Sequence, residues 1–325
     1  MIKKTSRKDA GSSKKLPRVL FVIGPTSSGK TDFGVQAAQE FHGEIINADA
    51  RQIYRQVSIG TGKPRGVSGL YHRRHRAFIH RAIPHYLMDF LPPSETYSAA
   101  EWREAAMKAV KGITKRKHLP IVVGGTGLYI AGMIDHLDFP NVPPQPKLRE
   151  AYEEKSLEEL VHLLLHIDPQ AGVEVDLRNK RRVVRALEMM TFTGKKMADL
   201  RKKGPPLVDG LQIGIKRSQE ELFARADATI DEMVASGLVD EVRSLLAQGI
   251  SESSPAFTAL GYREVAASLR GEMTTEEAVK CIKKITHSYI RRQQTWFKRD
   301  ARIMWVKDAE EGMEKVREWM GEGKS

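Results

Sequence analysis

The sequence contains a single cysteine, Cys281, among its 325 residues. One cysteine excludes an intramolecular disulfide and a multi-cysteine zinc site. Few cysteines and no disulfide are typical of proteins in a reducing compartment, so we expect a cytoplasmic protein. The chain also has no run of 18 or more apolar residues, so we expect no membrane-spanning helix. Its first residues lack the apolar stretch of a secretory signal.

The chain carries an excess of basic residues. Fifty-three Lys and Arg residues stand against 41 Asp and Glu residues, which gives a formal net charge of +12 at pH 7. Half of this excess lies in residues 1–18, which we expect to be a disordered basic tail, with an RNA-contacting arm or a transit peptide as alternatives. Such a charge favours a polyanionic partner but does not separate RNA from DNA or from an acidic membrane surface.

Apolar runs that alternate with helical patterns indicate an α/β fold. The segments RVLFVIG, GEIINAD and LPIVVGG have the unbroken apolar character of buried parallel strands. A helix is expected to begin after Ser98, because Ser98 and Glu101 have the spacing of a capping box. The order of these elements predicts a doubly wound parallel sheet. The expected strands and helices are residues 18–24, 30–41, 43–49, 98–117 and 119–125.

Prolines mark the exit from this core. The segment FPNVPPQP at 139–146 has four prolines in eight residues, so neither a helix nor a central strand crosses it. We expect residues 139–203 to form a helical basic insertion, because residues 172–203 carry ten Lys or Arg against four Asp or Glu. Residues 19–138 and 204–325 would then form one α/β core with a helical C-terminal portion.

The segment GPTSSGKT fits the phosphate-binding motif G-x-x-x-x-G-K-[ST], and it follows a strand and opens a helix, as this motif requires. Its backbone N–H groups would surround phosphate oxygens, Lys30 would reach the terminal phosphates, and Thr31 would hold Mg²⁺. The motif predicts a P-loop NTPase-like core and a bound di- or triphosphate, without specifying the reaction. The expected diphosphate-binding residues are Gly24, Pro25, Thr26, Ser27, Ser28, Gly29, Lys30 and Thr31.

Two further segments end strands at the edge where ligands bind in open α/β sheets. Asp49 follows the second strand, and its carboxylate could bind Mg²⁺, act as a general base or cap the next turn. The segment GGTG at 124–127 ends a third strand, where Thr126 could offer a hydroxyl to a phosphate or a base. A plain strand-to-helix turn is the alternative interpretation of GGTG.

With these segments and several others, the sequence resembles the tRNA dimethylallyltransferases, also called tRNA isopentenyltransferases or IPP transferases. The resemblance runs in order from about residue 19 to residue 305, and nine motifs in register are far more specific than any one of them. The matching segments are GPTSSGKT (24–31), NADARQIYR (47–55), IGTGKP (59–64), PHYLMD (84–89), TYSAAEW (96–102), PIVVGGTGLYI (120–130), RRVVRALE (181–188), GYRE (261–264) and RRQQTWFKRD (291–300).

The resemblance implies transfer of a dimethylallyl group from its diphosphate to N6 of adenosine 37 in the anticodon stem-loop of tRNA, by a monomer that uses Mg²⁺. It also implies that Asp49 is the general base, that Thr126 contacts the reacting centre, and that Arg225 stabilises the diphosphate. The tRNA-binding residues expected from it are Asp49, Ala50, Arg51, Gln52, Arg178, Asn179, Lys180, Arg181, Arg182, Gly261, Tyr262, Arg263, Arg291, Arg292 and Gln293.

Two groups of side chains are candidates for direct RNA contact. Four arginines in the insertion have the spacing of one helical face, which could lie along an RNA backbone or simply face solvent. Four aromatic residues could stack on unpaired bases, although Trp296 could equally be a core residue. The arginines are Arg178, Arg181, Arg182 and Arg185, and the aromatic residues are Trp296, Phe297, Tyr54 and Tyr262.

The sequence departs from the family pattern in three places. Ala50 and Ser58 stand where the family usually has serine and aspartate, and neither change removes a reacting group. The stretch 69–86 belongs to a longer connection than the family leads us to expect, and its simplest interpretation is a basic surface loop, with an RNA contact or a lid as alternatives.

Other functions share part of this pattern. A nucleotide or metabolite kinase would also have the phosphate loop and Mg²⁺, but it needs no basic helical insertion. A non-catalytic RNA-binding protein with a nucleotide switch would not need Asp49, Thr126 and Arg225 together. An adenylate prenyltransferase that acts on free AMP, ADP or ATP would not need basic segments spread over the insertion and the C-terminal helices.

Overall fold

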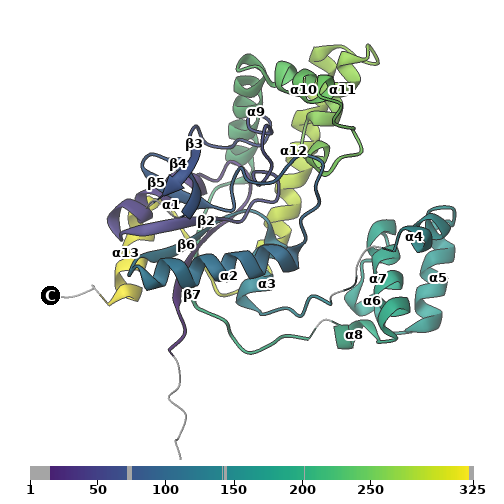
Figure 1. The fold of residues 1–325 in the computed structure, drawn as a ribbon, viewed down its shortest axis with the longest axis horizontal. Helices are drawn as coiled ribbons and strands as arrows, with labels where there is room; N and C mark the ends of the chain where they lie inside the picture. The colour runs from purple at the N-terminus through teal and green to yellow at the C-terminus, as the bar shows by residue number, and fades with distance from the viewer. Residues whose placement is uncertain (1–14, 72–74, 141, 143–144, 201, 322–325) are drawn as a thin grey trace, which may run out of the picture. The chain divides into compact units, whose positions relative to one another are not determined.

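The computed structural model describes residues 15–71, 75–140, 142, 145–200 and 202–321. Its contacts divide the chain into two compact units, of which one contains a β-sheet and the other is helical (Figure 1). The predicted insertion, residues 139–203, falls within the second unit. The first unit consists of Met1–Thr96, Glu104–Gly127 and Leu207–Ser325, and the second of Tyr97–Arg103 and Leu128–Pro206.

Over the described residues, the first unit is built on an eight-stranded sheet of order β3-β4-β5-β2-β6-β1-β7-β8. Strands β5, β2, β6, β1, β7 and β8 run parallel, whereas β3 and β4 are each antiparallel to their neighbours. The apolar segments predicted to be buried parallel strands form β1, β2 and β6, which confirms the expected α/β core. The strands are β1 (Arg18–Ile23), β2 (Gly43–Asn47), β3 (Val67–Tyr71), β4 (His75–His80), β5 (Ile83–Tyr86), β6 (Leu119–Gly124), β7 (Asp209–Ile215) and β8 (Ile303–Val306).

Helices pack on this sheet and extend beyond it. Phe33 of α1 and Met313 and Val316 of α13 belong to one apolar core with residues of β1, β6 and β7. Gly34 lets α1 approach the sheet closely, because a Cβ there would lie 2.6 Å from Cγ2 of Val123. The helices of the first unit are α1 (Lys30–Glu40), α9 (Gln219–Ala235), α10 (Leu238–Ala247), the 3₁₀ helix η1 (Pro255–Thr258), α11 (Tyr262–Leu269), α12 (Thr275–Phe297) and α13 (Ala309–Met320).

Capping boxes set the start of several helices. Ser218 and Glu221 begin α9, and Thr274 and Glu277 begin α12, with each side chain bonded to the other residue's backbone N–H. The capping box predicted at Ser98 is confirmed, because the Glu101 N–H donates to Ser98 Oγ at 3.2 Å and the Ser98 N–H to Glu101 Oε2 at 2.8 Å. The two helices whose residues are shared between the units are α2 (Ala99–Lys115) and α3 (Gly127–Ile134).

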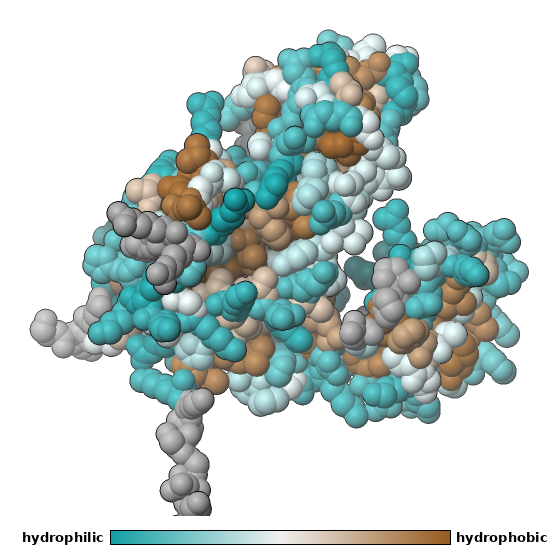
Figure 2. All heavy atoms as spheres, in the orientation of Figure 1, coloured by the Kyte–Doolittle hydropathy of each residue, from teal (hydrophilic) through white to brown (hydrophobic). Residues whose placement is uncertain are grey.

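The stretch 69–86 was predicted to be a basic loop, but its described residues, 69–71 and 75–86, extend the sheet through β3, β4 and β5, while residues 72–74 lie outside the described residues. Ala77 and Phe78 in β4 are buried, and this burial stabilises the hairpin against the rest of the sheet. Val67 and Leu70 on the edge strand β3 are 69% and 66% exposed, and apolar spheres appear near these strands in Figure 2. The loop interpretation was wrong because arginine and histidine interrupt the apolar residues, so the sequence shows no continuous apolar run that would indicate a strand.

The tail predicted for residues 1–18 overlaps the first strand. β1 begins at Arg18, whose Nη1 donates to the Met320 carbonyl at 3.2 Å. Arg18 therefore belongs to the core, whereas residues 1–14, on which most of the prediction rests, lie outside the described residues.

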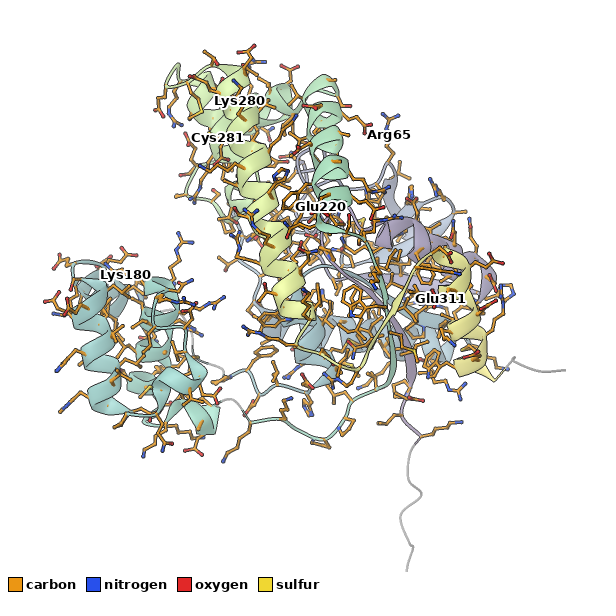
Figure 3. The ribbon with its side chains drawn as sticks, turned by 180° about the vertical axis from the view of Figure 1, so that it is seen from behind. Arg65, Lys180, Glu220, Lys280, Cys281 and Glu311 are labelled. Atoms are coloured by element: carbon orange, nitrogen blue, oxygen red, sulfur yellow. The ribbon has the colours of Figure 1, made fainter. Side chains whose placement is uncertain are left out.

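The second unit is helical, and its apolar core includes Leu160, Leu164 and Leu187. Glu188 is fully buried there, and its carboxylate accepts hydrogen bonds from Arg149 at 2.7 and 2.9 Å and from Arg185 at 2.9 Å. Figure 3 shows this unit from behind, with Lys180 labelled. Its helices are α4 (Pro146–Glu153), α5 (Leu157–Ile167), α6 (Ala171–Glu174), α7 (Lys180–Thr193) and α8 (Met197–Leu200).

In the part of the chain that the structure describes, no helix is both long enough and apolar enough to cross a membrane.

Candidate functional site

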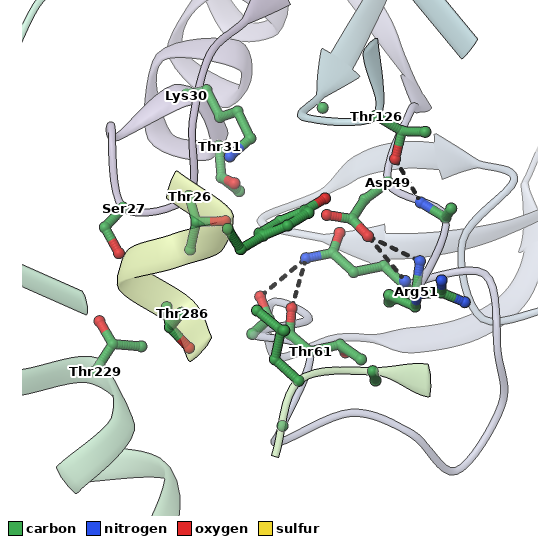
Figure 4. A pocket seen from close by; sticks show the side chains of 18 of the residues that line it. Thr26, Ser27, Lys30, Thr31, Asp49, Arg51, Thr61, Thr126, Thr229 and Thr286 are labelled. Carbon is green, nitrogen blue, oxygen red and sulfur yellow. Dashed lines mark hydrogen bonds between the residues drawn. The ribbon is translucent and has the colours of Figure 1, made fainter. Parts of the chain in front are cut away.

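A cavity of about 530 Å³ opens in the first unit at the carboxyl ends of β1, β2 and β6. Figure 4 shows Lys30 and Thr31 on one side of it and Asp49 on another. Its walls come from the phosphate loop, the turn after β2, the 57–63 loop, and helices α9 and α12. The lining residues include Thr26, Ser27, Lys30, Thr31, Asp49, Ala50, Arg51, Gln52, Gly60, Thr61, Thr126, Ile230, Met233, Ile282, Tyr289 and Arg292.

The phosphate loop joins β1 to α1, as its motif predicts. Gly24 and Gly29 have φ angles of 148° and 92°, and Ser27 has a φ of 65°, so the chain turns sharply to enter the helix. Lys30 reaches back across the loop, and its Nζ donates to the Pro25 carbonyl at 3.1 Å. Burial lowers the pKa of Lys30, although the charge of Asp49 opposes this effect. The Ser28 hydroxyl is buried without a hydrogen-bond partner in the loop.

Helices α9 and α12 hold the phosphate loop from the opposite side. Gln293 on α12 accepts from the Thr26 N–H at 2.9 Å, and its Nε2 donates to the Gly125 carbonyl at 3.0 Å. Arg225 on α9 donates through Nε to the Ser27 carbonyl at 2.9 Å. Arg225 therefore lies beside the loop that is predicted to bind the diphosphate. Gln293 is buried and binds backbone groups in this structure, and its role as an RNA contact stays a prediction.

Asp49 lies in a tightly bonded turn after β2. Its Oδ1 accepts from the Arg51 N–H at 2.8 Å and from the Gln52 N–H at 3.4 Å. Asn47 holds the backbone of Asp49 on both sides, because its Oδ1 accepts from the Asp49 N–H and its Nδ2 donates to the Asp49 carbonyl, each at 3.1 Å. This geometry fixes one carboxylate oxygen in the turn and presents the side chain to the cavity.

Thr126 connects the turn after β2 to the end of β6. Its Oγ1 accepts from the Ala50 N–H at 3.0 Å, and its own N–H donates to the Ala48 carbonyl at 3.1 Å. Because the hydroxyl acts as an acceptor for Ala50, its own hydrogen can be donated to a ligand in the cavity. The structure thus brings Thr126 and Asp49 to the same wall.

The other residues of the first unit that were predicted to contact RNA lie at the cavity, on the surface or in the interior. Arg51, Gln52 and Arg292 line the cavity, and the Arg292 guanidinium lies 5.6 Å from the centre of the Tyr289 ring. Arg263, Arg291 and Trp296 are exposed, whereas Gly261, Tyr262, Tyr54 and Phe297 are buried. The rings of Tyr262, Tyr54 and Phe297 are therefore covered by other residues in this structure, whereas Trp296 offers an exposed ring.

The arginines of the second unit do not form the single helical stripe that their spacing predicted. Asn179 caps α7 by accepting from the Arg182 N–H, so Arg178 precedes the helix. Arg182 lies 3.4 Å from Asp176, and Arg185 is bound to Glu188 and to the Val142 carbonyl. Lys180 donates to the Glu153 carbonyl at 2.8 Å. A shallow hollow of about 310 Å³ at this helix end is lined by Asn179, Arg181, Arg182, Arg185, Ala186, Met189 and Met197.

His85 is a buried titratable group beside the cavity that the sequence did not single out. It is 2% exposed, and its Nδ1 lies 3.0 Å from the Ile83 carbonyl. Burial lowers the pKa of His85 to about 4. Between pH 6.5 and 4 the unfolded chain therefore binds a proton that the folded chain does not, so stability falls as the pH falls through this window.

We expect His85 to make the protein acid-sensitive, with a loss of about 2 kcal/mol of unfolding free energy between pH 7 and pH 5. Replacing His85 with Gln should remove this part of the pH dependence, whatever it does to stability at pH 7. Denaturant unfolding at both pH values would measure it, with exposed His42→Gln as the control. Equal pH slopes for wild type and His85→Gln would contradict the assignment.

Several residues that build the site carry no motif signal of their own. Asn47 belongs to a recognised segment, but its role as a support for Asp49 depends on bonds that only the fold forms. Arg217, whose Nε donates to the Ser28 carbonyl at 3.2 Å, and Tyr289 come from helical or loop segments far along the chain. In the described parts of the chain, His, Cys, Asp and Glu side chains form no cluster of three or more suited to a metal ion.

Comparisons with known proteins show the family of this chain. The family model for IPP transferase matches residues 52–300, and the model for isopentenyl transferase matches residues 17–83. A tRNA dimethylallyltransferase of Thermomicrobium roseum is 39% identical over 305 residues, which cover 92% of this chain and 89% of that protein. One from Chloroflexus aggregans is also 39% identical, over 89% of this chain and 96% of its own length.

Solved structures give the same result. The tRNA isopentenylpyrophosphate transferase of Bacillus halodurans aligns with a TM-score of 0.67 and 29% identity, covering 94% of this chain and 96% of that one. A eukaryotic dimethylallyltransferase acting on tRNA aligns with a TM-score of 0.69 and 27% identity, over 86% of this chain and 69% of its own. These matches confirm the resemblance and the predicted fold class. The chain belongs to the IPP transferase family.

Proposed function

We propose that this protein transfers a dimethylallyl group from dimethylallyl diphosphate to N6 of adenosine 37 in the anticodon stem-loop of tRNA. One observation supports this function above all: the phosphate loop and the Asp49 carboxylate line the same cavity. A diphosphate held by the loop and an amine facing Asp49 would meet between them. We further propose that the protein acts as a monomer in the cytoplasm.

The phosphate-loop side of the cavity would bind the leaving group. Cleavage of the allylic C–O bond leaves negative charge on diphosphate, which the Lys30 ammonium, the Arg225 guanidinium and the backbone N–H groups before α1 would stabilise. The Thr31 hydroxyl offers a hard oxygen ligand of the kind that Mg²⁺ prefers, together with diphosphate oxygens. A bound Mg²⁺ would neutralise part of the developing charge.

The Asp49 side would accept the proton. As C1 of the dimethylallyl group leaves the diphosphate oxygen, it forms a bond to N6, and one N6 hydrogen passes to the Asp49 carboxylate. The lone pair of an exocyclic amine is delocalised into the ring, so a carboxylate that accepts this proton lowers the barrier. The products are N6-(dimethylallyl)adenosine and diphosphate. The Thr126 hydroxyl would contact the reacting groups from the same wall.

The adenosine would have to leave its stack to enter the cavity. Enzymes that modify bases generally extrude them, and the cost is lowest for bases that are already unpaired, as in a loop. Arg51 and Arg292 line the cavity and are placed to contact the RNA backbone or the base that enters.

A transfer assay would separate this function from its alternatives. Parallel reactions contain the protein, radiolabelled dimethylallyl diphosphate and one acceptor each. The acceptors are tRNA, a free nucleotide (AMP, ADP or ATP), and tRNA in which adenosine 37 is replaced by guanosine. We expect label on unchanged tRNA alone. Label on free nucleotides would instead indicate an adenylate prenyltransferase, and phosphate transfer from ATP without prenyl transfer would indicate a kinase.

We expect exposed arginines of the second unit to contribute to tRNA affinity. Arg178 is 94% exposed in its side chain, and Arg181 is also exposed, whereas Arg185 is bound to Glu188. Changing Arg178 and Arg181 to alanine should weaken tRNA binding and flatten the slope of log K against log salt by about 0.7–0.9 for each lost phosphate contact.

Filter binding at several salt concentrations measures this slope, with Lys195→Ala/Lys196→Ala as a control that removes the same charge from the same unit. Affinity for dimethylallyl diphosphate should not change in either double variant. An unchanged salt slope for Arg178→Ala/Arg181→Ala would mean that these arginines only face solvent.

A further inference from the structure

Glu241 on α10 inserts its carboxylate into the backbone of the 57–63 loop. Its Oε2 accepts from the Ser58 N–H at 2.8 Å and the Ile59 N–H at 2.9 Å, and its Oε1 from the Gly60 N–H at 3.2 Å. Three successive N–H groups that converge in this way form a site for an anion. In this protein the anion is a side chain of the chain itself, so the bonds fix the loop rather than bind a ligand.

Tyr262 completes this arrangement from α11. It is fully buried, and its hydroxyl donates to Glu241 Oε1. Gly60 lies directly against its ring, because a Cβ on Gly60 would be 2.5 Å from Tyr262 Cε2. Burial and the neighbouring Glu241 carboxylate raise the pKa of Tyr262, which keeps the hydroxyl protonated and able to donate. Glu241 and Tyr262 therefore hold the same segment of the loop.

The other end of the 57–63 loop is also fixed. Lys63 is 9% exposed, and its Nζ donates to the Tyr54 carbonyl and to Asp89 Oδ1, both at 2.6 Å. With both ends bonded, the middle of the loop has little freedom to move. That middle part, Thr61 and Gly62, lines the cavity.

A continuous series of hydrogen bonds leads from this loop to Asp49. The carbonyls of Thr61 and Gly62 accept from Gln52 Nε2 at 3.2 and 3.1 Å. The Gln52 N–H in turn donates to Asp49 Oδ1, beside the N–H of Arg51. Figure 4 shows Thr61 and Asp49 on the same side of the cavity, with the bonds of this series drawn as dashed lines.

We propose that Glu241 and Tyr262 are positioning residues: they fix the 57–63 loop and, through Gln52, the orientation of the Asp49 carboxylate toward the substrate amine. The proposal rests on the function proposed above. It assigns both residues to the acceptor side of the reaction, because the phosphate loop has its own supports in Arg225 and Gln293. Loss of the pair should therefore affect turnover with tRNA and spare the binding of dimethylallyl diphosphate.

Two variants disturb the Glu241–Tyr262 pair, one strongly and one mildly. Glu241→Gln keeps the size of the side chain but gives it one acceptor oxygen where three N–H groups and a hydroxyl need acceptors. Tyr262→Phe removes a single hydroxyl and keeps the ring against Gly60. Asp240→Asn is the matched control, since Asp240 is the neighbouring carboxylate on α10 and its side chain is 77% exposed in an ion pair with Arg243.

The measurements are kcat with saturating tRNA, the Kd for dimethylallyl diphosphate, and the thermal unfolding temperature of each variant. We expect kcat to fall about 10- to 100-fold for Glu241→Gln and about 3- to 10-fold for Tyr262→Phe, because displacements near 1 Å at a reacting group have effects of this size. The diphosphate Kd should stay within about twofold in both, and Asp240→Asn should behave as wild type.

Two results would overturn the proposal. One is a kcat near wild type in folded Glu241→Gln or, if that variant does not fold, in Tyr262→Phe. The other is a parallel loss of diphosphate affinity and turnover, which would mean that the pair stabilises the whole unit. Failure of the wild-type protein to modify tRNA would be a different outcome, and it would overturn the proposed function together with this inference.

Discussion

Replacing Asp49 with asparagine should lower the rate of dimethylallyl transfer by about 10²–10⁴-fold, the usual contribution of a positioned general base. The substitution is conservative in this turn, because the amide oxygen can accept from the N–H groups of Arg51 and Gln52 as Asp49 Oδ1 does. The turn should therefore keep its shape while the group that accepts the N6 proton is lost. Single-turnover transfer to tRNA would measure the effect.

Binding experiments separate loss of the base from loss of the site. The affinity of Asp49→Asn for tRNA should stay close to that of wild type. Asp209→Asn is a suitable control, because Asp209 begins β7 at the opposite end of that strand from the cavity and its side chain is 51% exposed. A nearly normal rate for Asp49→Asn would show that another group accepts the proton.

Replacing Lys30 with alanine should affect both binding and chemistry. Lys30 Nζ lies over the phosphate loop at 3.1 Å from the Pro25 carbonyl, where a diphosphate would replace or join this contact. Because the leaving group gains charge as the C–O bond breaks, loss of the ammonium should lower the rate by about 10²–10³-fold in addition to weakening the affinity for dimethylallyl diphosphate.

Isothermal titration with dimethylallyl diphosphate and single-turnover kinetics would measure the two effects of Lys30→Ala. Lys115→Ala, in an exposed lysine at the end of α2, is the control for the loss of one positive charge. If Lys30→Ala binds and uses dimethylallyl diphosphate as wild type does, the diphosphate is held elsewhere.

The central sheet could be predicted from the sequence because its strands are continuous apolar runs. β1, β2 and β6 read as buried strands, and the capping box at Ser98 marked the start of α2 correctly. The hairpin of β3 and β4 could not be predicted in this way. Its residues mix arginine and histidine with Ala77 and Phe78, and the pairing of β4 with β5 decides which side chains are buried.

The candidate site shows the same division. The phosphate loop and Asp49 could be predicted because local chain geometry places them at the end of a strand. The hydrogen bonds of Tyr262 and Gln293 could not be predicted, because their partners, Glu241 and Thr26, are distant in sequence and meet them only in the fold. An exposed and a buried tyrosine look alike in a motif.

A single helix boundary changed the prediction for the second unit. The spacing of Arg178 and Arg181 fits one helical face, but that argument holds only if both residues are helical. The Asn179 side chain accepts from the Arg182 N–H and caps the start of α7, so Arg178 lies outside the helix. Such boundaries depend on one side-chain bond, which a periodic pattern does not contain.

The position of β1 between β6 and β7 has a consequence for biosynthesis. Leu20 pairs with Ile121 on one side and with Leu211 on the other, and the larger part of the second unit, Leu128–Pro206, is translated between these two partners. A growing chain therefore carries β1 with an open, apolar edge until β7 has left the ribosome. Open strand edges promote aggregation, so we expect fragments that end before residue 209 to be less soluble than the full chain.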